Sequence, residues 1–214
     1  MSDGALVSAA KNLGVEMKSR EKKGDTEQEV VLLEARIDGS EPKPIKYKIL
    51  YTMGFTSYRK RMDVILQSPE DIKNQMVTII AKGADSHIRD NCLSPDERAK
   101  PGYNKTDTLA KAHADQGLRT LFVAEGKTSL ANYEAWQLEC NRVKDSDIKE
   151  EDKDEAYDTI DKKLEMGKNV DGTVGMKLLG STALEVRPLA VGTLFISALS
   201  SEAVLRAREG FAFG

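Results

Sequence analysis

Four short apolar segments, separated by turn-forming stretches, constrain the fold of this chain more than any other feature. In residues 45–53, lysines alternate with apolar side chains, which is typical of a strand with one buried face. Similar runs occupy residues 29–37, 62–67 and 75–81, and the polar stretches IDGSEPKPI and SPEDIKN separate them pairwise. This succession favours an antiparallel sheet over a doubly wound one. The alternation predicts that the buried face carries Ile45, Tyr47, Ile49, Tyr51 and Met53.

Helical patterns accompany these strands. The apolar spacing after Ser2 predicts a helix at about 3–13 that ends at Gly14. Other helices are expected from near Asp85, at about 105–116 and over 129–143, with strands over 118–125 and 177–185 and a loop over 94–104. At 214 residues, one domain is the simpler expectation. We therefore expect an α/β fold of the α+β type, in which a mostly antiparallel sheet is flanked by helices.

Composition limits the kinds of molecule that this chain is expected to bind. A net charge of -3 gives no overall attraction to nucleic acid or to anionic lipid, so phosphate binding would need a local cluster of cations. The two cysteines, Cys92 and Cys140, lie far apart and indicate neither a disulfide framework nor a zinc site. The longest weakly apolar run, 188–199, falls short of the roughly 20 residues that span a bilayer. We expect no nucleic-acid binding and no membrane insertion by this chain.

Three possible motifs fail on spacing. The segment AEGKTS (124–129) lacks the glycine that a phosphate-binding loop needs five residues before its second glycine, because that position is Leu121. His87, Cys92 and His113 have no companions at metal-ligand spacing. The acidic residues at 150–155 alternate with lysine, which is typical of a solvated helix face. With no nucleophile and base marked out either, the sequence predicts no catalytic residue and no metal site.

One scattered set of residues has the chemistry of nucleotide binding. Phe55 precedes the basic run Arg59, Lys60 and Arg61, while Lys82 stands before Gly83 and Arg119 follows Gly117. A nucleobase stacks on an aromatic ring with about 1 to 3 kcal/mol, and cations neutralise phosphates. Spacing alone leaves a plainer alternative, a core phenylalanine with surface cations.

Six blocks of sequence resemble one family. They are SDGALVSAAKNLG, FTSYRKRMDVI, AKGADSHI, DQGLRTLFVA, YEAWQ and LLGSTALE, in this order, and they cover about residues 1–185. The blocks are similar to the nucleotide-binding domain of P-type ATPases. Within that family, the sequences RKRM and GLRTL resemble the phospholipid-translocating branch, the flippases. This resemblance implies the fold of that domain, an ATP-binding function and a parent protein in a membrane, with this domain on the cytoplasmic side.

The resemblance also implies roles for single residues. Phe55 would stack on adenine, Lys82 would lie at the base of the pocket, and Arg119 would hold the phosphate end. The remaining roles that it implies are Lys60 near the base or phosphates, Met62 in the pocket lining, and Asp3 in place of a glutamate that contacts the adenine amino group. Gly83 joins the set on its own chemistry, because a glycine lets backbone come close to a ligand. Tyr58 replaces an aspartate of the family pattern, and the SPDE at 94–97 lies in the wrong place to match it.

The family motifs for phosphorylation, dephosphorylation and magnesium binding do not occur in this sequence. The resemblance therefore implies a chain that binds ATP without turning it over, with Mg²⁺ supplied largely by a separate phosphorylation domain. That domain and the actuator domain of a full-length flippase would be its partners. Residues 186–214 match nothing in the family, and we expect them to form a poorly ordered tail. Two alternatives stay open: a non-catalytic interaction module, and an inert truncated product of a flippase gene.

Overall fold

The computed structural model describes residues 2–23, 27–34, 43–184 and 194–195. The end of the strand expected over 29–37 and most of the 186–214 tail lie outside these residues. Within them, no helix combines the length and the apolar character that crossing a membrane requires.

The sheet follows chain order from one edge to the other, and every neighbouring pair is antiparallel. Its strands are β1 (Val15–Lys22), β2 (Gln28–Glu34), β3 (Lys43–Met53), β4 (Arg61–Gln67), β5 (Met76–Gly83), β6 (Arg119–Ser129), β7 (Lys177–Leu184) and the short β8 (Leu194–Phe195). The expected mostly antiparallel sheet flanked by helices is confirmed. Strand β1 was not predicted, because its sequence VEMKSREK is too polar to show a buried face.

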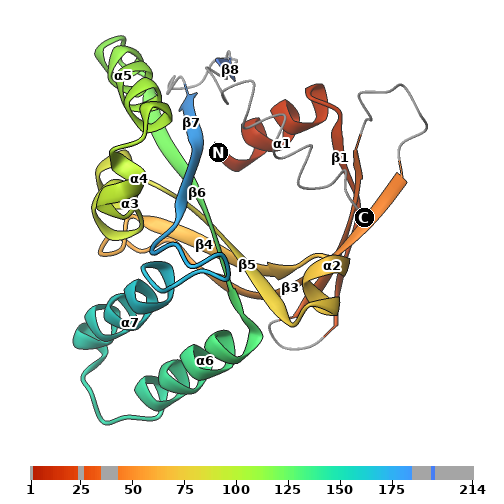
Figure 1. Cartoon of the computed structure of the whole chain (residues 1–214), viewed down its shortest axis with the longest axis vertical. Coiled ribbons are helices and arrows are strands. Elements are labelled where there is room, and N and C mark those ends of the chain that lie inside the picture. The colour runs from red at the N-terminus through yellow and green to blue at the C-terminus, as the bar shows by residue number, and fades with distance from the viewer. Residues whose placement is uncertain (1, 24–26, 35–42, 185–193, 196–214) are drawn as a thin grey trace.

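Seven helices are described beside the sheet: α1 (Ser2–Asn12), α2 (Pro69–Lys73), α3 (Asp85–Asn91), α4 (Pro95–Arg98), α5 (Pro101–Asp115), α6 (Leu130–Lys144) and α7 (Glu150–Glu165). Figure 1 shows a curved sheet with α3 to α7 on its outer side and α1 on its inner side. The core lies between the outer helices and the sheet, where Ile65, Ile79, Phe122 and Trp136 are buried.

Two helix predictions need correction. The stretch 94–104, expected to be a loop, contains α4 and the first turn of α5, because Ser94 accepts a hydrogen bond from the Glu97 N–H and a proline starts each helix. The connection SPEDIKN forms the short helix α2, which a capping box between Ser68 and Asp71 begins. Gly14 and Gly117 do have the positive φ expected at helix ends, 89° and 79°.

The buried face of β3 changes along the strand. Tyr47 and Met53 are buried as predicted, but Leu50 is buried as well, whereas Ile45, Ile49 and Tyr51 are only half-buried. Ile49 pairs with Leu66 and Tyr51 with Ile65, so Leu50 is an extra residue at a bulge. The simple alternation was therefore wrong at this point, since a bulge shifts which side chains face the core.

Candidate functional site

Most of the predicted site residues gather at one end of the sheet. Strand β3 ends at Met53, β4 begins at Arg61, β5 ends at Gly83 and β6 begins at Arg119, and antiparallel pairing puts these four strand ends together. These six residues, from Phe55 to Arg119, are thus brought together by strand order, although they are up to 64 residues apart in the chain.

Three of the predicted side chains share one face of the sheet. Met62 lies directly opposite Lys82, and Lys82 lies opposite Val123. Directly opposed residues point to the same face, and so do residues two and four apart along a strand, which adds Arg119. This is the face away from the buried core, and Figure 1 shows α1 on that inner side. Met62 and Lys82 are half-buried there, while Arg119 is exposed.

Phe55 lies in the loop 54–60 that joins β3 to β4. Its side chain is 57% exposed, so the ring is not part of the core. The loop is closed by a hydrogen bond of 2.9 Å from the Lys60 N–H to the Thr56 carbonyl. Lys60 has a φ of 51°, a left-handed conformation that is uncommon for a residue with a side chain. The plainer alternative of a core phenylalanine is therefore excluded by the fold.

Gly83 adjoins the backbone of Lys60. The N–H of Ala84 donates to the Lys60 carbonyl at 3.0 Å, and a Cβ on Gly83 would lie 2.7 Å from that oxygen and 2.5 Å from the Arg61 Cβ. This position has no room for a side chain. Gly83 thus allows strands β4 and β5 to lie in close contact.

Asp3 is the member of the set that the structure places least directly. It belongs to α1, which packs against β1, and its side chain lies outside the described residues. The helix is on the inner side of the sheet, the side to which Met62, Lys82 and Arg119 point. A contact between Asp3 and a nucleotide stays a prediction.

The basic run at 59–61 does not act as one patch. Lys60 is exposed, but Arg59 and Arg61 are 4% and 0% exposed. The hypothesis that all three cations surround the phosphates is therefore wrong for the two arginines. Their partners are carboxylates of α7, which reach them from about a hundred residues further along the chain.

No protein-family profile matches the chain. Individual relatives do. Phospholipid-transporting ATPase IC of Xenopus tropicalis is 29% identical over 90% of this chain, and phospholipid-transporting ATPase ID of Mus musculus is 30% identical over 86% of it. Phospholipid-transporting ATPase VA of Homo sapiens is 35% identical over 43% of the chain.

The chain is similar in sequence to phospholipid-transporting ATPases. It spans only 13% of the length of the Xenopus and mouse proteins and matches 6% of the human one. The similarity to the Xenopus and mouse proteins extends over 90% and 86% of this chain, in agreement with the six blocks of its sequence.

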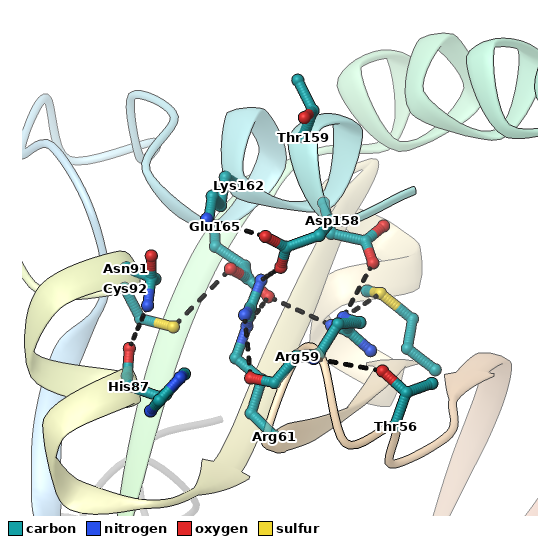
Figure 2. A network of polar contacts seen from close by, with 12 residues as sticks. Thr56, Arg59, Arg61, His87, Asn91, Cys92, Asp158, Thr159, Lys162 and Glu165 are labelled. Atoms are coloured by element: carbon teal, nitrogen blue, oxygen red, sulfur yellow. Dashed lines mark hydrogen bonds and ion pairs between the residues drawn. The ribbon is translucent and has the colours of Figure 1, made fainter. Parts of the chain in front are cut away.

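The two buried arginines belong to what we call the buried ion cluster: Arg59, Arg61, Asp63, Asp158, Asp161 and Glu165. Figure 2 labels Arg59, Arg61, Asp158 and Glu165 of this cluster. Arg61 pairs with Glu165 at 2.8 Å and with Asp158 at 2.9 Å. Arg59 pairs with Asp161 at 3.1 Å, with Glu165 at 3.3 Å and with Asp63. Two guanidinium groups thus face four carboxylates away from water.

The signal that could have revealed the acidic half of the cluster is helical spacing. Asp158, Asp161 and Glu165 are three and four residues apart, so they share one face of α7. The surrounding segment is dense in both charges, and a solvated face was the reasonable interpretation of residues 150–155. Because charged residues are so frequent in this segment, the three buried carboxylates could not be told apart from exposed ones in the sequence.

The excess of negative charge appears in the pKa values. Burial raises the pKa of Asp161 to about 6, against the opposing effects of Arg59 and of the hydrogen bond from Trp136. Burial and the charge of Glu165 also raise the pKa of Asp63, whose Oδ1 has no hydrogen-bond partner among the described residues. At Asp158 burial acts in the same direction, but hydrogen bonds from Lys162 and Arg61 outweigh it and lower the pKa.

These shifts predict an unusual pH dependence of stability. Because the pKa values of Asp63 and Asp161 are raised on folding, the folded state binds more protons than the unfolded state, and their stabilisation is lost as the pH rises. We expect the free energy of unfolding to fall by about 1 to 2 kcal/mol between about pH 5 and pH 8. Urea unfolding at several pH values measures this.

The matched variant for this prediction is Asp161→Asn, which keeps an oxygen to accept from Trp136 Nε1 but cannot titrate. Its unfolding free energy should depend less on pH over the same interval. A parent protein whose stability instead rises from pH 5 to pH 8 would contradict the assignment.

Several weaker candidates for a functional site are not supported by the structure. The AEGKTS segment runs along β6 as extended chain, so it forms no phosphate-binding loop. Glu97 of the SPDE sequence is buried, accepts from the Leu178 N–H at 3.1 Å and pairs with Lys100. Among the described residues, no three histidine, cysteine or acidic side chains are grouped as metal ligands. Two hollows lie between α6 and α7, about 500 and 260 Å³ in volume, and neither is lined by a predicted site residue.

Proposed function

We propose that this chain binds ATP as the nucleotide-binding domain of a phospholipid-transporting ATPase. The observation that supports this most is the joint position of an exposed aromatic ring and cations at one sheet end: Phe55 and Lys60 in the loop 54–60, Lys82 and Arg119 on neighbouring strands. An exposed ring offers a stacking surface for adenine, and the cations offer charge to phosphates. The similarity to phospholipid-transporting ATPases supports the same assignment.

In this proposal the seven residues divide the ligand between them. Phe55 and Asp3 would contact the base, Met62 would line the pocket, and Gly83 would let backbone approach the ligand. Lys82 would lie at the base of the pocket, Lys60 would approach the base or phosphates, and Arg119 would hold the phosphate end. On the family resemblance, we further propose that Mg²⁺ is held mainly by a phosphorylation domain, that this domain and an actuator domain are the partners, and that the site faces the cytoplasm.

Affinity is expected to be modest. One stacked base and a few water-exposed cations leave about 4 to 6 kcal/mol after the entropic cost of association, which corresponds to a dissociation constant between roughly millimolar and tens of micromolar. We expect no hydrolysis by this chain, because neither a phosphoryl acceptor nor a metal site is among its predicted residues.

The test of this function is Phe55→Ala in an ATP titration. Because stacking contributes about 1 to 3 kcal/mol, the dissociation constant should rise by about fivefold to a hundredfold. Stability should change little, since the ring is 57% exposed. The matched control is Tyr58→Ala, which removes an aromatic ring of the same loop that is 49% exposed. Equal affinity of Phe55→Ala and the parent would refute the proposed site.

A further inference from the structure

Arg59 is bonded to both neighbours of the candidate stacking ring. Its Nη1 donates to the Gly54 carbonyl at 3.3 Å, and its backbone N–H donates to Thr56 Oγ1 at 3.1 Å. Phe55 is the residue between these two. Arg59 therefore holds the chain on both sides of the exposed ring, at Gly54 through its buried side chain and at Thr56 through its backbone N–H.

The same guanidinium group is fixed from the other side by helix α7. Its Nε lies 3.1 Å from Asp161 and its Nη2 3.3 Å from Glu165, and the second oxygen of Asp161 accepts from Trp136 Nε1 at 3.0 Å. Figure 2 shows Arg59 between Thr56 of the loop and the carboxylates of α7. Arg59, Asp161 and Glu165 are buried, so water does not compete for the contacts between them.

We propose that Arg59 is a positioning residue for the nucleotide site, which ties the loop 54–60 to helix α7 and thereby sets the position of Phe55 for adenine. This inference rests on the proposed ATP-binding function. Arg59 itself does not contact the ligand, because it is 4% exposed. Its effect is on preorganisation: a loop already held in its binding conformation loses less entropy when the base stacks.

The geometry requires arginine in particular. The planar guanidinium spans the Gly54 carbonyl on one side and three carboxylates on the other. A lysine would preserve the positive charge in the cluster, but its compact ammonium group cannot bridge all of these partners at once. Arg59→Lys therefore separates the bridging geometry from the charge.

The experiment measures the binding of two probes, ATP and inorganic tripolyphosphate, to the full chain. Tripolyphosphate has the phosphates without the base. For Arg59→Lys we expect ATP affinity to fall about tenfold and tripolyphosphate affinity to stay within twofold of the parent. The matched control is Asp158→Asn, which weakens the pairing of α7 with Arg61 and leaves the partners of Arg59 unchanged. It should alter neither affinity by more than twofold.

Two results would overturn the inference. One is an ATP affinity of Arg59→Lys within twofold of the parent, and the other is an equal loss for both probes, which would indicate general structural damage. If Arg59→Lys does not fold, Asp161→Asn replaces it, because this change removes the α7 carboxylate that pairs with Arg59 Nε and keeps an oxygen to accept from Trp136 Nε1. A selective loss of ATP affinity of about threefold is then expected, and an unchanged affinity would count against the inference.

Hydrogen exchange separates failure of this inference from failure of the proposed function. The amides of residues 54–60 should exchange about tenfold faster in Arg59→Lys than in the parent, with no nucleotide present. If ATP does not bind the parent, or binds Phe55→Ala equally well, the proposed function fails. If Phe55→Ala loses ATP but Arg59→Lys neither loses ATP nor exchanges faster, only the positioning role fails.

Discussion

Replacing Arg61 by methionine is expected to lower the free energy of unfolding by about 3 to 5 kcal/mol, the usual cost of removing one partner from a buried ion pair. The side chain is fully buried, and it pairs with Glu165 and Asp158. Its loss would leave one buried guanidinium, that of Arg59, beside four carboxylates. Urea unfolding of the parent and the variant measures the difference.

The opposite change in the same cluster should be milder. Glu165→Gln keeps an acceptor for Arg61 Nε and removes one of four negative charges, which reduces the repulsion that raises the pKa of Asp63. We expect a loss of about 1 to 2 kcal/mol, since a charge-assisted hydrogen bond becomes a neutral one. Arg61→Met should be the more destabilising of the two variants, because the cluster contains four carboxylates and only two guanidinium groups.

A surface arginine supplies the control. Arg142 of α6 is exposed, and Arg142→Met should change stability by no more than about 0.5 kcal/mol. A value for Arg61→Met within about 1 kcal/mol of the parent would mean that the buried ion cluster contributes little to folding.

Gly83→Ala is the second change expected to have a large effect. The new Cβ would lie 2.5 Å from the Arg61 Cβ, 2.7 Å from the Lys60 carbonyl oxygen and 2.8 Å from the Arg61 Cα. Two of these atoms are backbone, so no side-chain rotation relieves the contact, and strands β4 and β5 must separate at this end. Overpacking of this kind costs about 1 to 3 kcal/mol or more.

The effect should extend to ligand binding. Separation of the two strands displaces Lys60 from Ala84 and Met62 from Lys82, so ATP affinity should fall together with stability. Thermal unfolding and an ATP titration on the same sample measure both. Gly102→Ala is the matched control, because nothing lies within 4 Å of its Cβ and the residue is in helix α5.

Alanine at position 102 should leave ATP affinity unchanged and stabilise the chain by at most about 1 kcal/mol, since alanine has the higher helix propensity. If Gly83→Ala were as stable as the parent, the close approach of β4 and β5 at this position would be disproved.

Local sequence patterns determined the regular part of this fold. Alternating and apolar runs marked β2 to β7, and glycines at 14 and 117 marked helix ends where a positive φ is needed. These features depend on neighbours in the chain, which is why they are visible in sequence. The polar strand β1 and the short helices α2 and α4 lack such a pattern or are too short to show one.

The candidate site was only partly determined in this way. Residue chemistry pointed to Phe55, Lys60, Lys82, Gly83 and Arg119, and the family resemblance added Met62 and Asp3. The strand register brings all of them except Asp3 to one end of the sheet. Their roles toward ATP stay predictions. The exposure of Phe55 had to come from the fold, because an isolated phenylalanine after a strand is equally compatible with a core position.

Only the tertiary structure decided that Arg59 and Arg61 are buried. A run of three cations predicts an exposed patch, since burying a guanidinium group costs several kcal/mol unless carboxylates compensate it. Here the compensating Asp158, Asp161 and Glu165 are about a hundred residues away along the chain, on one face of α7. Short-range patterns fixed which segments are strands and helices, whereas the burial of Arg59 and Arg61 depends on a long-range charge balance that exists only after α7 has packed against β4.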